Sequence, residues 1–514
     1  RVEGEVVDID AIKLDDKRTF DLIKSTRTLG VFQIESPGQR ELIGKFAPNT
    51  FTDLVIDISL FRPGPVKSDM ISPFLSSRHN LAQRPKIHPD LEPILKETEG
   101  VVVFHEQVIA IIAKLTGTTL AVADEKRREL GDFAGQQRVC DWFFPAALAN
   151  GYQIEVINKV WEVLRAFASF GFCKAHAAAF ALPTYQSAWL KSHHTAAFFA
   201  GVLTHDPGMY PKRVILDDAR QWGISIASLD VNKSDIGYRV ERSKPSTRSP
   251  YKAQNLKSTG VELELPDARG YAIRIGLSAL SGISTDESNS IVSNRPYIDL
   301  ADFIYRSAAS RPIVEGLIKV GAFDELHQLG SNNLNRRDLL LHAADIYKLN
   351  SERGLSGQLT FDLKPPKLEP SGLPDLSSSD VAKNEIDLLG MDVSKHLIEF
   401  YGDFLNSIGA VRSCDLIKER SGREVLVAGI KVALQTPPVR SGRRVMFLTL
   451  DDGFGCNDIT FFEDVQISSA SLLRNSWLFL IKGEIRRTGP RGLSIRALEA
   501  WELSDSYEKW RSLK

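Results

Sequence analysis

The chain has 514 residues, 43% of them hydrophobic and 25% charged, which is ordinary globular composition and excludes a wholly disordered, collagen-like or fibrous protein. A chain of this length is too long for one compact core, so we expect several domains. Because 64 lysines and arginines are balanced by 65 aspartates and glutamates, the net charge does not indicate a nucleic-acid binder, and any such binding must come from local patches.

Membrane and disulfide signals are missing from the sequence. No apolar run approaches the roughly 18 to 20 residues that span a bilayer, and the opening RVEGEVVDID does not resemble a signal peptide. The four cysteines form no CxxC pair, which argues against a zinc ribbon or a disulfide scaffold. We expect a protein of a reducing cytoplasm and, since the chain opens on Arg1, a piece of something longer.

Helical periodicity dominates residues 1–241. Apolar residues recur at helical spacing in the segments 108–115, 154–170 and 185–203. The polar stretch that follows, RSKPSTRSPYKAQNLKST, has the composition of an exposed loop. We therefore expect a mainly α first block that ends at a linker over 242–269.

A second helical block is predicted over residues 270–350, where short periodic segments are punctuated by glycines. The Pro/Ser-rich stretch 364–379 that follows predicts another linker.

The last hundred residues change to short runs rich in β-branched and aromatic residues, separated by turn clusters such as DDGFG and TGPRG. These runs lie at 425–434, 445–450, 458–462, 477–484 and 493–502. Five such strands suit a small nucleic-acid-binding barrel. The predicted fold is therefore multidomain and mainly α, followed by a C-terminal all-β barrel.

The pentapeptide FRPGP at 61–65 follows an apolar run. Its two prolines and glycine fix a kinked backbone that would hold the Arg62 guanidinium at a defined angle, as in a phosphate or carboxylate clamp. An ordinary turn with a solvated arginine is the alternative.

Polar residues also stand at two predicted helix starts. Glu106 and Gln107 open one helix, where capping is the alternative role; a zinc site is excluded because position 109 is isoleucine. Lys174 and His176 precede a helix of small residues, where cations oppose the helix dipole but would help backbone N–H groups hold an anion such as a triphosphate. A satisfied surface pair is the alternative there.

The best local basic patch lies in two predicted turns of the barrel. It comprises Arg440, Arg443, Arg444, Arg486, Arg487, Arg491 and Arg496. Next to exposed aromatic side chains, such a patch would suit single-stranded nucleic acid, whereas a solvated barrel rim is the alternative.

Five segments occur in the order seen in the bacterial DNA polymerase III alpha subunit, a C-family DNA polymerase. They are FRPGP, FHEQV, ADEKRRELG, FASFGFCKAHAAAFALPTYQSAWLKSHH and LIKVGAFDEL. The chain resembles the C-terminal portion of this family from about residue 8 to about residue 502. Departures such as GDFAGQQ after Arg127 and Arg128 suggest an error-prone or accessory paralogue.

The resemblance implies an order of domains. They are the end of the palm (1–17), the fingers (18–241), a linker (242–269), a tandem helix-hairpin-helix region (270–350), a linker with connecting helices (351–412), an OB-fold nucleic-acid-binding domain (413–505) and a tail (506–514).

The chemistry that the resemblance implies is nucleotidyl transfer from dNTP substrates, with two Mg²⁺ ions held by three palm aspartates. The family's PDxD-type and DFLGL-type motifs do not occur here, and Asp8 and Asp10 match a later segment. We therefore assign no catalytic residue and no metal ligand to this chain, and expect that it does not polymerise by itself. A non-enzymatic DNA-binding or scaffold protein is the alternative function.

The resemblance also implies binding residues. The nucleotide would contact Arg62, Gly64, Glu106, Gln107, Lys174 and His176; DNA would contact Gly282, Gly321 and the seven arginines of the patch. Ser284 replaces a usual second glycine, which weakens the approach of a phosphate to the first hairpin. A sliding clamp would bind Gln358, Leu359, Phe361 and Leu363. The expected partners are primer-template DNA, single-stranded template, the clamp and other replisome or repair subunits in the bacterial cytoplasm.

Overall fold

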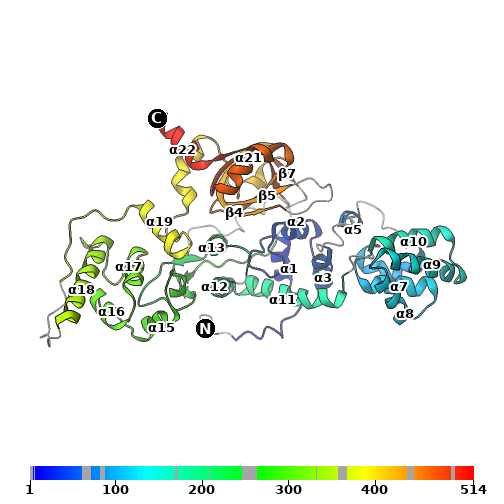
Figure 1. Ribbon diagram of the computed structural model, residues 1–514, viewed down its shortest axis with the longest axis horizontal. Coiled ribbons are helices and arrows are strands. Elements are labelled where there is room, and N and C mark those ends of the chain that lie inside the picture. The colour runs from blue at the N-terminus through cyan, green and yellow to red at the C-terminus, as the bar shows by residue number, and fades with distance from the viewer. Residues whose placement is uncertain are drawn as a thin grey trace.

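The structure is a computed structural model, in which an elongated helical body carries a β-barrel on one long side (Figure 1). It describes residues 4, 6–60, 71–80, 87–167, 172–206, 208–245, 263–331, 333–356, 367–436, 445–487 and 493–513. Ten predicted site residues lie outside the described residues: Arg62, Gly64, Arg440, Arg443, Arg444, Arg491, Gln358, Leu359, Phe361 and Leu363.

The centre of the body forms around α11 (Lys174–His193), which packs against α3 (Phe51–Leu60) and α1 (Lys17–Lys24). The neighbouring helices are α2 (Pro37–Phe46), α12 (Thr195–His205) and α13 (Lys212–Gln221). One helix was predicted over 185–203, but His194 leaves the helical conformation (φ −126°, ψ 51°) and separates α11 from α12. The apolar spacing continues across this break, so periodicity does not reveal it.

A lobe of short and medium helices lies at one end of the body (Figure 1). Its elements are η1 (Pro89–Leu91), α6 (Glu92–Leu95), η2 (Lys96–Thr98), α7 (His105–Thr116), α8 (Leu120–Glu129), α9 (Phe133–Ala149) and α10 (Ile154–Phe167). The helix α5 (Ile71–Arg78) packs on α2 of the centre instead. The helix predicted over 108–115 lies within α7, and the one predicted from residue 154 corresponds to α10.

A small sheet leads to the helices at the opposite end. Its strands are β1 (Ser225–Ala227), β2 (Arg239–Arg242) and β3 (Tyr271–Arg274), in the order β1-β3-β2. Residues 242–269, predicted to be a linker between domains, thus connect two paired strands of one sheet. The helices that follow are η3 (Leu277–Ala279), α15 (Thr285–Ser293), α16 (Leu300–Arg306), α17 (Arg311–Lys319) and α18 (Arg336–Ser356).

The barrel closes with five strands, as predicted, in the order β4-β5-β6-β8-β7. Its strands are β4 (Glu424–Gln435), β5 (Met446–Asp451), β6 (Cys456–Phe461), β7 (Leu478–Arg487) and β8 (Leu493–Glu502). The helices around it are η4 (Leu397–Tyr401), α20 (Gly402–Ser407), η5 (Leu416–Lys418), α21 (Glu463–Asn475) and α22 (Leu503–Ser512). The helix α19 (Ser378–Leu389), which precedes them, packs on α17 of the body. The helix α21, which connects β6 to β7, was not predicted.

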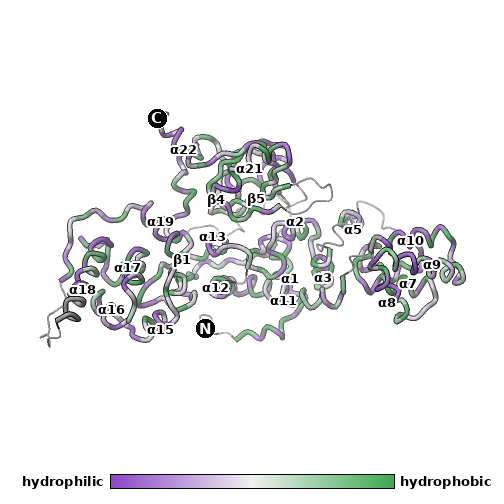
Figure 2. Tube along the Cα trace, viewed as in Figure 1, coloured by the Kyte–Doolittle hydropathy of each residue, from purple (hydrophilic) through white to green (hydrophobic). Residues whose placement is uncertain are grey.

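The barrel and the body have separate hydrophobic cores. One cluster runs through the body from Phe20 to Met391, and a second fills the barrel interior around Leu448, Phe461 and Phe479. Hydrophobic and hydrophilic residues are interleaved along the trace (Figure 2). Within the described ranges no single helix is long and apolar enough to cross a membrane; α7 and α8 together pass that test, but they are bent by 114°.

A buried ion pair fixes α11 in the body. Lys191 Nζ lies 2.7 Å from Asp218 Oδ2 of α13 and donates to the carbonyl oxygen of Leu29 at 2.7 Å. Lys191 is 0% exposed and Asp218 4%. We expect Asp218→Ala to lower the free energy of unfolding by about 3–5 kcal/mol, because an uncompensated charge stays buried.

Urea unfolding of the purified chain measures this loss. The control is Arg128→Ala, which breaks the exposed pair with Asp124 and should cost at most about 1 kcal/mol. Equal losses in the two variants would contradict the prediction.

Asp57 of α3 makes the stability of the folded chain depend on pH. It is 0% exposed, and neither carboxylate oxygen has a hydrogen-bond partner among the described residues. Burial raises the pKa of Asp57 well above its usual value. The protonated Asp57 carboxyl therefore contributes its full stability at pH values below about 3.9, its pKa in the unfolded chain. That stability is lost as the pH rises through its higher pKa in the folded chain.

We therefore expect Asp57→Asn to gain stability over the unmodified chain as the pH rises from about 4 to about 7. Urea midpoints of both proteins at both pH values test this. A difference in urea midpoint between the two proteins that is the same at both pH values would refute this prediction.

Candidate nucleic-acid interface

The first turn of α11 carries the predicted cation pair. The backbone N–H of Lys174 donates to both oxygens of Glu106, at 3.0 and 3.1 Å. Lys174 Nζ donates to Glu97 at 2.7 and 2.8 Å. A helix N-terminus attracts anions. At this one the anions are the carboxylates of Glu106 and Glu97, which belong to the chain itself.

Gln107 has a structural role in the same corner. Its Oε1 accepts from the backbone N–H groups of Val103 and Phe104, at 2.8 and 3.0 Å. Its Nε2 donates to Thr98 Oγ1 at 2.7 Å, and the residue is 5% exposed. The side chain therefore caps α7, which is the capping role weighed from the sequence, while Glu106 reaches over to α11.

A row of rings follows from the start of α11. His176 lies 4.5 Å from the Phe180 ring and 5.2 Å from the Phe172 ring, between centroids. Phe180 stacks on Phe32 at 5.9 Å with an interplanar angle of 12°. The spacing of four residues places His176 and Phe180 on one face of α11, and Phe172, which precedes the helix, joins them through its ring contact with His176. That spacing is visible in the sequence, but the participation of Phe32 is not.

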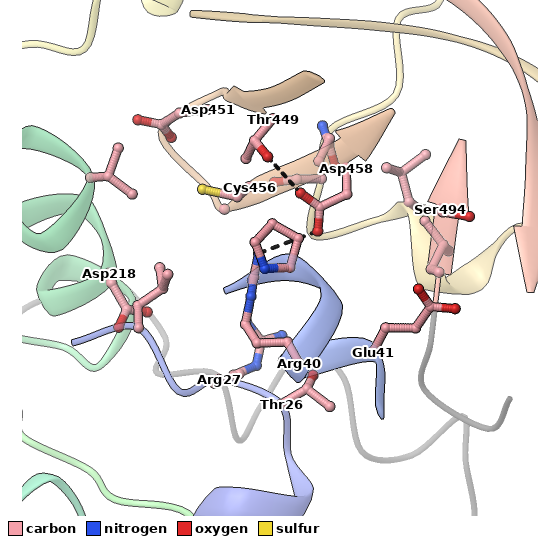
Figure 3. A pocket seen from close by; sticks show the side chains of 18 of the residues that line it. Thr26, Arg27, Arg40, Glu41, Asp218, Thr449, Asp451, Cys456, Asp458 and Ser494 are labelled. Atoms are coloured by element: carbon pink, nitrogen blue, oxygen red, sulfur yellow. Dashed lines mark hydrogen bonds and ion pairs between the residues drawn. The ribbon is translucent and has the colours of Figure 1, made fainter. Parts of the chain in front are cut away.

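A cavity of 580 Å³ separates the barrel from the helical body. Figure 3 shows Thr449, Asp451, Cys456 and Asp458 of β5 and β6 on one side. The second and third strands of an OB barrel form its usual face for oligonucleotides. In this structure that face turns toward α2 and the loop that precedes it.

The charges that line this cavity do not favour a phosphate backbone. Its lining includes two guanidinium groups against five carboxylates: Arg27, Arg40, Glu41, Asp217, Asp218, Asp451 and Asp458. Arg40 Nη2 is already paired with Asp458 Oδ2 at 3.2 Å. Phosphate contacts are therefore more favourable at the barrel rim than inside the cavity.

The described part of the basic patch divides into two roles. Arg486 and Arg496 both lie over the Phe462 ring, at 5.7 and 5.5 Å from its centroid. Arg487 instead donates to the carbonyl oxygens of Ile417 and Glu419, which anchors the η5 turn. Two of the described arginines thus accompany an aromatic side chain, as single-strand binding requires.

The predicted hairpin glycines both have positive φ, +83° at Gly282 and +84° at Gly321. A Cβ on Gly321 would lie 2.3 Å from Arg336 Nη2, so a side chain there would displace that guanidinium group and adopt a strained backbone conformation. Ser284 caps α15, since its Oγ accepts from the backbone N–H of Glu287 at 3.1 Å. Although burial opposes the charged form, hydrogen bonds from Ser284 and Ser310 lower the pKa of Glu287 to about 2.

Family models match three parts of the chain in the predicted order. They are the finger domain of the bacterial DNA polymerase III alpha subunit at residues 1–150, a helix-hairpin-helix motif at 223–339 and an OB-fold nucleic acid binding domain at 425–503. The predicted resemblance to the polymerase III alpha subunit is confirmed. The hairpin match includes all three strands of the small sheet.

Related proteins match most of the chain. An error-prone DNA polymerase of Symbiobacterium thermophilum is 34% identical over 487 residues, which is 89% of this chain and 44% of that protein. DNA polymerase III subunit alpha of Aquifex aeolicus is 30% identical over 495 residues, 94% of this chain and 38% of that protein. DNA polymerase III subunit alpha of Escherichia coli K12 is 29% identical over 527 residues, which is 98% of this chain and 43% of that protein. The chain thus spans less than half the length of these relatives.

The barrel rim generates a prediction about single-stranded DNA. We expect Arg486→Ala and Arg496→Ala each to weaken binding of a labelled oligothymidine, and to lower the slope of log affinity against log salt by about 1 for each lost phosphate contact. Fluorescence anisotropy at several salt concentrations measures both quantities. The control is Lys509→Ala in α22, an exposed cation away from the rim, which should bind like the unmodified chain. Unchanged affinity in both arginine variants would contradict this interface.

Proposed function

We propose that this chain is the fingers, helix-hairpin-helix and OB-fold part of a bacterial DNA-directed DNA polymerase of the polymerase III alpha type. It binds incoming dNTP and primer-template DNA during replication or damage-associated synthesis in the bacterial cytoplasm. The observation that carries this proposal is the order of the three matched regions along one chain. The domains keep the order expected from the sequence, and the helix-hairpin-helix match extends across the linker expected at 242–269.

The nucleotide site of this proposal is the first turn of α11. The triphosphate takes the position that Glu106 occupies at the Lys174 backbone N–H, and the Lys174 ammonium group, which donates to Glu97, turns toward it. Arg62 and Gly64, which lie outside the described residues, complete the phosphate contacts. The ring of His176 and its aromatic neighbours border the same turn.

Metal chemistry belongs to the rest of the polymerase in this proposal. Two Mg²⁺ ions would activate the primer hydroxyl and stabilise the leaving pyrophosphate when bound, and no residue of this chain is assigned as their ligand. Consistent with that division, the described acidic residues beside α11, Glu97 and Glu106, are engaged by Lys174. This chain binds and orients the nucleotide.

DNA and clamp contacts complete the proposal. The OB rim binds single-stranded template, the hairpin glycines Gly282 and Gly321 contact duplex backbone, and the segment with Gln358, Leu359, Phe361 and Leu363 binds the sliding clamp. Support for the first two comes from the matched nucleic-acid-binding modules.

One observation favours the second candidate, a non-enzymatic DNA-binding scaffold. The carboxylates of Glu97 and Glu106 already satisfy the cations and N–H groups that a triphosphate would use. A scaffold needs no triphosphate at this position. In a polymerase, Glu106 must move away from the start of α11 so that the triphosphate can bind there.

Nucleotide kinetics of the intact, longer polymerase decide between the two. We expect Lys174→Ala and Arg62→Ala each to raise the KM for dNTP or lower kcat by about 10-fold or more, since a hydrogen bond to a charged group contributes about 1.5–3 kcal/mol. The control is Lys114→Ala on α7, whose exposed ammonium group is 3.7 Å from Asp90 and should not affect the kinetics. Unchanged kinetics in both test variants would leave the scaffold as the function.

A further inference from the structure

Four buried side chains meet where the barrel joins the helical body. Asp217 lies in α13, Asp392 and His396 lie between α19 and η4, and Asp451 ends β5. Each of them is at most 3% exposed. Three segments that are distant in sequence therefore place one imidazole and three carboxylates in a space closed to solvent.

The imidazole lies among the carboxylates. His396 Nε2 is 3.5 Å from Asp451 Oδ2, 3.6 Å from Asp217 Oδ2 and 3.9 Å from Asp392 Oδ2. These separations are too long for good hydrogen bonds. They are slightly larger than the roughly 3.4 Å between neighbouring ligands of a tetrahedral zinc ion with bonds of about 2.0–2.1 Å.

All four of these inward-facing atoms are without a hydrogen-bond partner in the part of the chain that the structure describes. Buried polar atoms are nearly always paired in native proteins, so four orphaned atoms at one point indicate a missing partner. Ligand atoms of Asp217, Asp392 and His396 all lie within 4.8 Å of one another, so one small cation between them would satisfy these three side chains. Asp451 Oδ2, by contrast, lies 3.6 Å from Arg213 Nη1.

The other atoms of the cluster are held in place by the surrounding chain. Asp451 Oδ1 accepts from the Gly453 N–H at 3.0 Å, and Asp217 Oδ1 accepts from Arg220. Gly453 has φ +79°, and a Cβ there would lie 2.9 Å from Cγ of His396. The ring and two of the carboxylates are therefore positioned by contacts that leave their inward atoms available.

Two arginines approach the cluster as well. Arg220 pairs with Asp217, and Arg213 Nη1 lies 3.6 Å from Asp451 Oδ2.

We propose that three of these side chains bind one divalent cation of the zinc type, with His396 Nε2 and the Oδ2 atoms of Asp217 and Asp392 as ligands and Asp451 beside them. Carboxylate oxygens and an imidazole nitrogen are common zinc ligands. The ion joins α13 to the turn after α19, next to the end of β5.

A proton is the competing occupant of this site. His396 Nδ1 accepts a hydrogen bond from the Ile398 N–H at 3.2 Å, which turns Nε2 inward and, without a metal, leaves the proton on Nε2. Zinc binding displaces that proton and moves the ring proton to Nδ1, at the cost of the long contact with Ile398.

Metal content of the purified 514-residue chain tests the proposal. After chelation and reloading with Zn²⁺, we expect about one bound ion per chain and a higher thermal unfolding midpoint, because a ligand that binds the folded state stabilises it. His396→Gln and Asp392→Asn should weaken Zn²⁺ binding at least about 10-fold, the smaller loss seen when even an outer partner of a metal site is removed. Both substitutions keep nearly the same side-chain volume.

The matched control is His342→Gln, which replaces another buried histidine, in α18. It should bind Zn²⁺ as the unmodified chain does. Circular dichroism of every protein separates loss of folding from loss of metal. A folded chain that binds no Zn²⁺, Mn²⁺ or Mg²⁺, or folded cluster variants that bind Zn²⁺ normally, would overturn the site and leave the proton as its occupant.

Discussion

The position of the barrel depends on contacts across its junction with the body, because each part buries its own hydrophobic core. Val432 and Cys456 of the barrel pack against the body core. Arg40 pairs with Asp458, Arg213 donates to the carbonyl oxygen of Lys431, and Gln221 Nε2 donates to the carbonyl oxygen of Gly453 at 2.8 Å. Polar contacts are directional and can exchange with water. The cavity and the buried cluster both lie at this junction.

Carboxylates of the chain itself occupy the places where a nucleic-acid enzyme would be expected to hold phosphates. Glu106 covers the start of α11, and Glu287 covers the start of α15. Each contact satisfies helix N–H groups that would otherwise be unpaired. A phosphate that enters either place therefore exchanges one anion for another, and its net affinity is smaller than the number of donors suggests.

The sequence alone predicted those features of the structure that residues close together in the chain determine. The alternation of apolar residues predicted all five barrel strands, and the position of Gln107 at a helix start indicated its capping role. Long-range partners were not readable. Arg40 and Asp458 are 418 positions apart, and no pattern near Asp217 or His396 marks them as neighbours. The sequence analysis therefore assigned no metal ligand to residues that the fold brings together.

The pairing of β2 with β3 has a consequence for how this protein can vary. Arg242 and Tyr271 are direct register partners, so the chain leaves the small sheet and returns to it at adjacent points. The cost of closing a flexible loop rises by only about 0.6 kcal/mol when its length doubles. Leu263, Leu265 and Ala268, just before β3, belong to the body core, so an insertion or a fused reporter domain in the segment between the two strands leaves that core intact only if it keeps these three residues in place.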